Sequence, residues 1–195
     1  MFVRQVMTPD PVTVRAGTTV KTALRLLDEN EISSLPVVDA NGRICGVVSE
    51  ADLIHDLVGP DQRLHEIPVA EPSPQHGCVD EVMTAKAITV QQDTDLAIAV
   101  DLVTSTGIKS LPVVDSEDRV VGMVSRRDVV RVLARADEAL EQEVDALLVA
   151  AGMPDWLVDV HDGIAEISGP ETSRERTLAK VLARTVPGVI AVNVA

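Results

Sequence analysis

Two short motifs place a hydroxyl and a carboxylate at the start of a predicted helix. Ser49-x-x-Asp52 follows the run RICGVV, and Ser125-x-x-Asp128 follows the similar run RVVGMV. A serine in this position caps a helix, and the acidic residue completes a capping box, which contributes about 1 kcal/mol. A helix N-terminus also attracts phosphate, and a carboxylate one turn further can accept hydrogen bonds from two ribose hydroxyls. The pattern is compatible with helix capping alone and also with ligand binding.

The second motif carries positive charge that the first lacks. Arg126 and Arg127 replace Glu50-Ala51, and Lys109 replaces Ser33 shortly before the corner. Cations at a helix N-terminus oppose the dipole and cost a few tenths of a kcal/mol without a counter-ion. The two arginines can simply face water, but the misfit favours a bound anion. Because Glu50 would repel a phosphate, we expect an anion to prefer the second motif.

The two motifs belong to an ungapped internal duplication. Val6-Met7-Thr8 returns as Val82-Met83-Thr84, and SLPVVD at 34–39 returns at 110–115. Agreement in both spacing and residue type indicates repeated structural units. The sequence of each unit predicts the element order β-α-β-β-α. In the first unit, helical periodicity covers 18–30 and a hairpin turn is expected at Asn41-Gly42. Two such units can bury their apolar faces against each other and leave a cleft along a pseudo-twofold axis.

The fold class predicted from these patterns is α+β. We expect repeat one at 1–59, a proline-rich linker at 60–80, repeat two at 81–136 and a separate α-β-β-α-β domain at 137–195. The linker region has three of the four histidines in or beside it, with a cysteine nearby, but no zinc-ligand spacing, so a solvated linker is favoured over a metal site. These residues are His55, His65, His76 and Cys78.

Composition excludes several classes of function. A net charge of −14 argues against nucleic-acid binding, and Phe2 and Trp156 are the only aromatic residues available for base stacking. No signal peptide is evident, and two cysteines without CxxC spacing suit a reducing cytoplasm. No catalytic motif is found, so we do not expect an enzyme.

The repeated unit resembles the CBS domain in its tandem form, the Bateman module. The resemblance covers about residues 1–136 and rests on VMTPDPVTV, SSLPVVD and GVVSEAD, with their second copies VMTAKAITV, KSLPVVD and GMVSRRD. The C-terminal segment resembles a BON domain through DGIAEISG and VPGVIAVNV, a shorter and less specific match.

The CBS resemblance implies a regulatory protein that binds AMP, ADP, ATP or S-adenosylmethionine and forms a homodimer. In that family the serine and aspartate of the corner hold ribose and phosphate, the position of Lys109 often contacts phosphate, and adenine lies against the first strand and the Pro-Val strand. The implied ligand-binding residues are Thr13, Val14, Pro36, Val37, Ser49, Asp52, Thr89, Val90, Lys109, Pro112, Val113, Ser125, Arg126, Arg127 and Asp128. Pro36 and Pro112 can equally be ordinary strand starts.

The BON resemblance implies contact with a protein partner or a membrane surface. Residues 137–195 hold eleven acidic residues against four basic ones, which disfavours binding to anionic lipid. We therefore expect a ligand sensor that relays its state through the C-terminal domain to a protein partner. The alternatives are a membrane-surface stress protein with a structural CBS dimeriser, and a ligand-free accessory subunit of an enzyme.

Overall fold

The computed structural model describes residues 1–57 and 77–195. Both repeats have the predicted mixed α and β order, which confirms an α+β fold. The first repeat contains η1 (Val3–Gln5), β1 (Thr8–Pro9), β2 (Val14–Arg15), α1 (Val20–Glu29), β3 (Ser34–Val38), β4 (Ile44–Ser49) and α2 (Glu50–Leu57). The second contains α3 (Val79–Val82), β5 (Thr84–Ala85), β6 (Val90–Gln91), α4 (Leu96–Ser105), β7 (Ser110–Val114), β8 (Val120–Ser125) and α5 (Arg126–Leu133).

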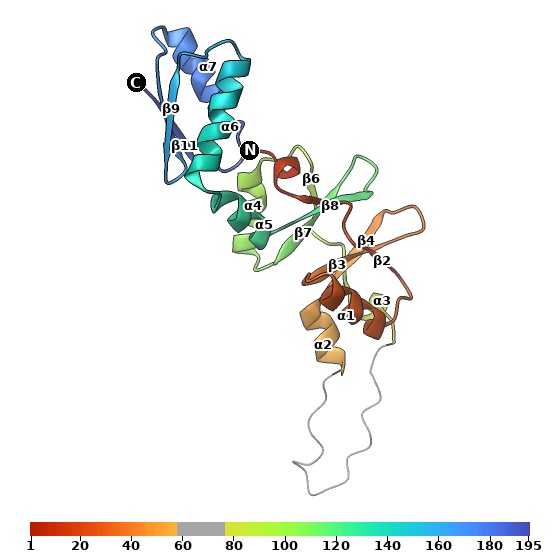
Figure 1. Cartoon of the computed structure of the whole chain (residues 1–195). Coiled ribbons are helices and arrows are strands. Elements are labelled where there is room, and N and C mark those ends of the chain that lie inside the picture. The colour runs from red at the N-terminus through yellow and green to blue at the C-terminus, as the bar shows by residue number, and fades with distance from the viewer. Residues whose placement is uncertain (58–76) are drawn as a thin grey trace, which may run out of the picture.

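The two repeats exchange their first segments. The sheet of repeat two has the order β1-β8-β7-β6, and that of repeat one has the order β2-β3-β4-β5. Val3 of η1 and Val79 of α3 are fully buried, each in the hydrophobic core of the other repeat. Figure 1 shows the red N-terminal segment lying among the green elements of repeat two. The boundaries predicted from the duplication therefore follow the sequence repeat but not the packed units.

A glycine in each repeat makes room for the exchanged strand. A Cβ on Gly46 would lie 2.7 Å from the Thr84 carbonyl oxygen, and one on Gly122 would lie 2.5 Å from Met7 Sδ. At Gly46 the close atom is a backbone oxygen, so this site needs glycine for close approach of the neighbouring chain, whereas at Gly122 it is the end of a flexible side chain. The pairing of Met-Thr with Gly in the duplicated sequence thus has a packing cause.

The hairpins of the two repeats meet across the pseudo-twofold axis. Ile44 N–H donates to the Asp118 carbonyl at 2.9 Å, and Val120 N–H donates to the Gly42 carbonyl at 3.1 Å. These bonds flank an antiparallel bridge between Arg43 and Arg119. All of these contacts join equivalent or neighbouring positions of the two copies, so the hairpins hold the repeats in a symmetric pair.

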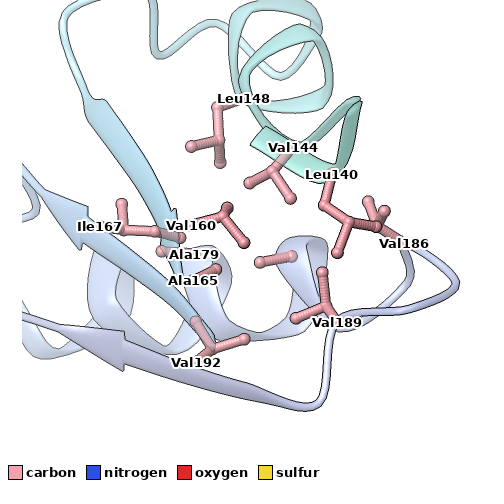
Figure 2. Packing of buried hydrophobic residues seen from close by; sticks show 11 residues of the cluster. Leu140, Val144, Leu148, Val160, Ala165, Ile167, Ala179, Val186, Val189 and Val192 are labelled. Carbon is pink, nitrogen blue, oxygen red and sulfur yellow. The ribbon is translucent and has the colours of Figure 1, made fainter. Parts of the chain in front are cut away.

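The C-terminal residues form a third sheet with its own core. The elements are α6 (Asp137–Ala150), β9 (Leu157–His161), β10 (Ile164–Ser168), α7 (Ser173–Ala183) and β11 (Ala191–Val194). The strands are ordered β11-β10-β9, with β10 parallel to β11 and antiparallel to β9. Figure 2 shows Leu140, Val144 and Leu148 of α6 pointing toward residues of the sheet and α7. This arrangement has the predicted α-β-β-α-β order.

The predicted linker lies mostly outside the described residues, including His65 and His76. Its last two positions, Val79 and Asp80, begin α3 instead of continuing an irregular segment. Val79 is buried in the core of repeat one, and this tertiary contact explains the short helix. Among the residues described, no helix is both long and apolar enough to cross a membrane.

Candidate functional site

A cavity of about 1150 Å³ lies between the two repeats. The wall from repeat one comes from the segment after β1, the end of α1, the start of β3 and the start of α2. The wall from repeat two comes from the start of β7, from β8 and from α5. The lining residues are Thr8, Asp10, Pro11, Val12, Leu24, Leu27, Asp28, Asn30, Glu31, Ile32, Ser33, Ser34, Glu50, Lys109, Ser110, Met123, Ser125, Arg126, Arg127, Asp128 and Arg131.

The second Ser-x-x-Asp corner opens into this cavity. Ser125 caps α5, and its N–H and Oγ–H both donate to Asp128 Oδ2, at 2.9 and 2.6 Å. Arg131 Nη1 donates to the other carboxylate oxygen, Oδ1, at 3.2 Å. The Asp128 residue is only 7% exposed, so its carboxylate is held in one orientation. This corner presents a helix N-terminus and a fixed acceptor to the same space, as the motif predicts.

The first corner has the same bonds but a different position. Ser49 N–H and Oγ–H donate to Asp52 Oδ2 at 2.8 and 2.7 Å, which reproduces the capping box of the second copy. Neither Ser49 nor Asp52 lines the cavity, although their neighbour Glu50 does. Identical local geometry therefore serves capping in the first copy, and only the second copy combines capping with access to this cavity.

Glu50 joins the two corners electrostatically. Its carboxylate forms an ion pair with the Lys109 ammonium group, and both side chains are about half exposed. The sequence groups Glu50 with the first corner, and we expected its repulsion to act there. Glu50 is the first residue of α2, and its side chain also lines the cavity into which the second corner opens, so its repulsion is not confined to the first corner. The repelling carboxylate and the phosphate-attracting cations share one cavity.

The remaining cations of the cavity differ in how they are held. Arg131 is paired with Asp128, and Arg126 donates to the Gly107 carbonyl oxygen at 3.2 Å. Arg127 makes no ion pair with any residue in the described ranges 1–57 and 77–195 and is exposed. Three carboxylates of repeat one line the same cavity. These are Asp10, Asp28 and Glu31.

The cavity lining includes a buried hydroxyl pair. The Oγ atoms of Ser34 and Ser110 lie 2.5 Å apart, at the equivalent positions of the two copies. Ser34 is 9% exposed and Ser110 is 7% exposed. The pair marks the pseudo-twofold axis and satisfies two polar groups that open the buried strands β3 and β7.

Most of the predicted adenine-contacting residues lie elsewhere. Val37 and Val113 are completely buried, and Val14 and Val90 are at most 6% exposed, so they belong to the two cores. Pro36 and Pro112 are buried inside β3 and β7 as strand residues. The structure brings Lys109, Ser125, Arg126, Arg127 and Asp128 to the cavity; it does not place there Thr13, Val14, Pro36, Val37, Ser49, Asp52, Thr89, Val90, Pro112 or Val113.

Sequence reasoning missed the residues that repeat one contributes to the cavity. Thr8, Pro11 and Val12 arrive because β1 pairs with β8, a crossover that no local pattern reveals. The contribution of Arg131 could have been predicted, because this residue lies three residues after Asp128 on the same helix face. The described residues hold no group of three or more histidine, cysteine or acidic side chains that could bind a metal ion.

Both repeats match the same family model. The CBS domain model matches residues 3–59 and 79–135. Homoserine O-acetyltransferase from Methanocorpusculum labreanum is 32% identical over 125 residues, which is 64% of this chain and 23% of that enzyme. The chain thus spans about a quarter of the length of the first curated relatives that it matches.

Solved structures resemble the paired repeats. CBSX2 from Arabidopsis thaliana in complex with AMP is 31% identical, with a TM-score of 0.53 over 67% of this chain and 93% of that one. The CBS domain pair of protein MJ0100, in complex with 5′-methylthioadenosine and S-adenosyl-L-methionine, is 25% identical, with a TM-score of 0.57 over 68% and 94%. Both of these relatives hold adenosyl ligands.

Proposed function

Because this chain belongs to the CBS domain family, whose model covers more than half of it as a tandem pair, we propose that it is a non-enzymatic regulatory protein that binds an adenosyl ligand. The observation that carries the proposal is the opening of the Ser125–Asp128 corner into a cavity large enough for such a ligand. Pockets for small ligands typically occupy ~300–1,000 Å³.

The corner supplies the polar part of the proposed site. Asp128 Oδ1 accepts only one bond from the described residues, at 3.2 Å from Arg131, so it has capacity for a ribose hydroxyl. Charge-assisted hydrogen bonds of this kind are worth roughly 1.5–3 kcal/mol. AMP and 5′-methylthioadenosine, which the two relatives hold, both contain a ribose, the group that such a carboxylate would bind.

The apolar lining supplies a surface for the base. Val12, Ile32 and Met123 are partly buried and line the cavity from both repeats. We assign the adenine to these side chains instead of the Pro-Val strands expected from the family resemblance. A planar base in contact with aliphatic side chains gains hydrophobic stabilisation of roughly 25 cal/mol per Å² of apolar surface buried.

Helix α5, whose N-terminus faces the cavity, reaches the C-terminal domain at its other end. At its far end, the Val132 carbonyl lies 3.0 Å from where a Cβ on Gly188 would stand, and Arg135 Nη1 donates to the Pro187 carbonyl at 2.5 Å. Gln5, just before the exchanged strand β1, donates to the Thr185 carbonyl at 3.1 Å. We propose that ligand-dependent movement of α5 and β1 is relayed through these contacts.

We infer from the α-β-β-α-β order and the DGIAEISG segment that residues 137–195 form a BON-like domain. Its proposed role is to present the ligand state of the CBS pair to a protein partner. A homodimer through the CBS pair is part of the proposal, and exposed apolar side chains on its helices offer a surface for it. These side chains are Ile54, Ile98, Val130 and Leu133.

A cytoplasmic location completes the proposal. Cys45 is exposed and Cys78 is partly buried, and both are free thiols, as expected of a protein in a reducing compartment.

A thermal-shift panel with AMP, ADP, ATP, S-adenosylmethionine and 5′-methylthioadenosine tests this function. A ligand at 100 times its Kd stabilises the folded state by about 2.7 kcal/mol, which raises the unfolding midpoint by several degrees. We expect at least one adenosyl compound to do so and guanosine monophosphate to do so less. Flat curves for all five compounds at millimolar concentration would refute the proposed binding function.

A further inference from the structure

We propose that Glu50 is the specificity-determining residue of this cavity and that it directs the site toward adenosyl ligands without a 5′ phosphate. The inference rests on the proposed function and names the ligand class of the same site. Its ligands carry an uncharged thioether or a cationic sulfonium at the 5′ position, and nucleotides bind more weakly.

The first observation is the ion pair between Glu50 and Lys109. Lys109 lies beside the second corner, because its carbonyl accepts a hydrogen bond from Arg126 N–H at 3.2 Å. Glu50 comes from the other repeat, and its carboxylate already pairs with the ammonium group that a phosphate would need. A phosphate must displace this carboxylate or accept its repulsion, and both reduce affinity. A ligand with no 5′ charge leaves the pair intact.

The second observation is the overall charge of the cavity. Five carboxylates line it against four cations, so the lining carries a net charge of about −1. The carboxylates are Asp10, Asp28, Glu31, Glu50 and Asp128, and the cations are Lys109, Arg126, Arg127 and Arg131. Two of the four cations are already paired with carboxylates of the cavity. Bringing a phosphate dianion into such a space is unfavourable, whereas a sulfonium cation is attracted.

The asymmetry between the repeats supports a selective role. The positions equivalent to Glu50 and Lys109 are Arg126 and Ser33, which cannot form an ion pair. The Glu50 and Arg126 N–H groups make matching bonds to the Ser33 and Lys109 carbonyls, at 3.0 and 3.2 Å. The backbone is therefore symmetric, and the charge pattern alone distinguishes the two halves. The pair is not needed to build the fold.

Calorimetric titration of the full-length protein with 5′-methylthioadenosine and with AMP tests the proposal, because the two probes share the adenosine group. In the wild type we expect 5′-methylthioadenosine to bind roughly tenfold more tightly than AMP. Glu50→Gln should strengthen AMP binding by roughly tenfold and change 5′-methylthioadenosine binding by less than about twofold. Glu31→Gln is the control, because it removes the same charge from the lining without touching Lys109.

The outcomes are distinguishable. AMP affinity that stays unchanged in Glu50→Gln, or that rises equally in Glu31→Gln, would overturn the role of Glu50 while leaving the proposed binding function intact. Tighter binding of AMP than of 5′-methylthioadenosine to the wild type would overturn the ligand class. Absence of binding by both probes to the wild type and to both variants would overturn this inference, and the proposed function would fall with it if ADP, ATP and S-adenosylmethionine also fail to stabilise the protein.

Discussion

The hydroxyl oxygens of Ser34 and Ser110 lie 2.5 Å apart on the pseudo-twofold axis. The two serines occupy equivalent positions of the two repeats, and each is less than a tenth exposed. The contact joins the starts of β3 and β7 in the lining of the cavity. A buried hydroxyl that loses its partner pays the cost of desolvation without compensation, whereas removing both partners of a buried pair costs less.

A double-mutant cycle on this pair should show strong coupling. We expect Ser34→Ala and Ser110→Ala each to lower the free energy of unfolding by about 1–3 kcal/mol, and the double variant to lose less than the sum. Urea denaturation of the four proteins provides the measurement. Additive losses would mean that the two hydroxyls do not depend on each other.

The duplication, the element order and the charged corner could all be predicted from the sequence. Apolar periodicity defines α1 and α4, and the serine and aspartate of each corner form the expected capping box. These features depend on residues close together in the chain, which is why a local pattern reveals them.

The exchange of β1 and β5 could not be predicted, because two-residue strands carry almost no pattern and their partners lie more than a hundred or about forty residues away. This exchange brings Thr8 and Asp10–Val12 into the cavity wall and so changes which residues form the site. The SLPVV strands were predicted as part of the ligand surface, but all five residues of each strand are buried, and their leucine and first valine belong to the hydrophobic cores.

The two close-approach glycines should differ in their tolerance of alanine. An added methyl group at Gly46 meets the Thr84 backbone oxygen at 2.7 Å, which cannot move without shifting β5. At Gly122 the first obstacle is the Met7 side chain, and the Thr8 backbone oxygen lies at 3.2 Å. We expect Gly46→Ala to lower the free energy of unfolding by about 1–3 kcal/mol and Gly122→Ala to cost less.

Truncating the methionine beside each glycine shows which group obstructs the added methyl group. Met7→Ala should recover part of the loss caused by Gly122→Ala, whereas Met83→Ala should recover little of that caused by Gly46→Ala, because the Thr84 oxygen stays in place. Denaturation midpoints of the single and double variants would reveal this difference. A larger loss at Gly122 than at Gly46 would contradict the packing explanation of the exchange.

Arg135 should couple the CBS pair to the C-terminal domain. Its guanidinium donates to the Pro187 carbonyl at 2.5 Å and pairs with Glu143 at 2.6 Å. In the wild type, adenosyl ligand should slow amide hydrogen exchange around residues 184–190, because it steadies α5 and the contacts at its end. Arg135→Ala should abolish this distant effect and leave ligand affinity within about twofold.

Arg184→Ala is the matched control for the relay. Arg184 is exposed and its side chain makes no hydrogen bond or ion pair within the described part of the chain. It should behave as wild type in hydrogen exchange with and without ligand. If Arg135→Ala preserves the ligand-dependent protection of residues 184–190, the relay does not pass through this contact.

The two Ser-x-x-Asp corners provide an internal comparison for ligand binding. Asp52 and Asp128 make the same capping hydrogen bonds, but only Asp128 lines the cavity. Replacing either with alanine removes an equivalent cap, worth about 1 kcal/mol of stability. Asp128→Ala additionally loses the ion pair with Arg131, so it should unfold at a slightly lower temperature than Asp52→Ala. Ligand affinity is therefore compared between the two folded variants, in which the difference reports on the cavity.

Isothermal titration of Asp128→Ala and Asp52→Ala with 5′-methylthioadenosine, beside the wild type, decides whether the second corner binds the ligand. We expect Asp128→Ala to weaken binding by at least about tenfold and Asp52→Ala to change it by less than about threefold. Wild-type affinity in Asp128→Ala, or an equal loss in both variants, would contradict a ligand site at the Ser125–Asp128 corner.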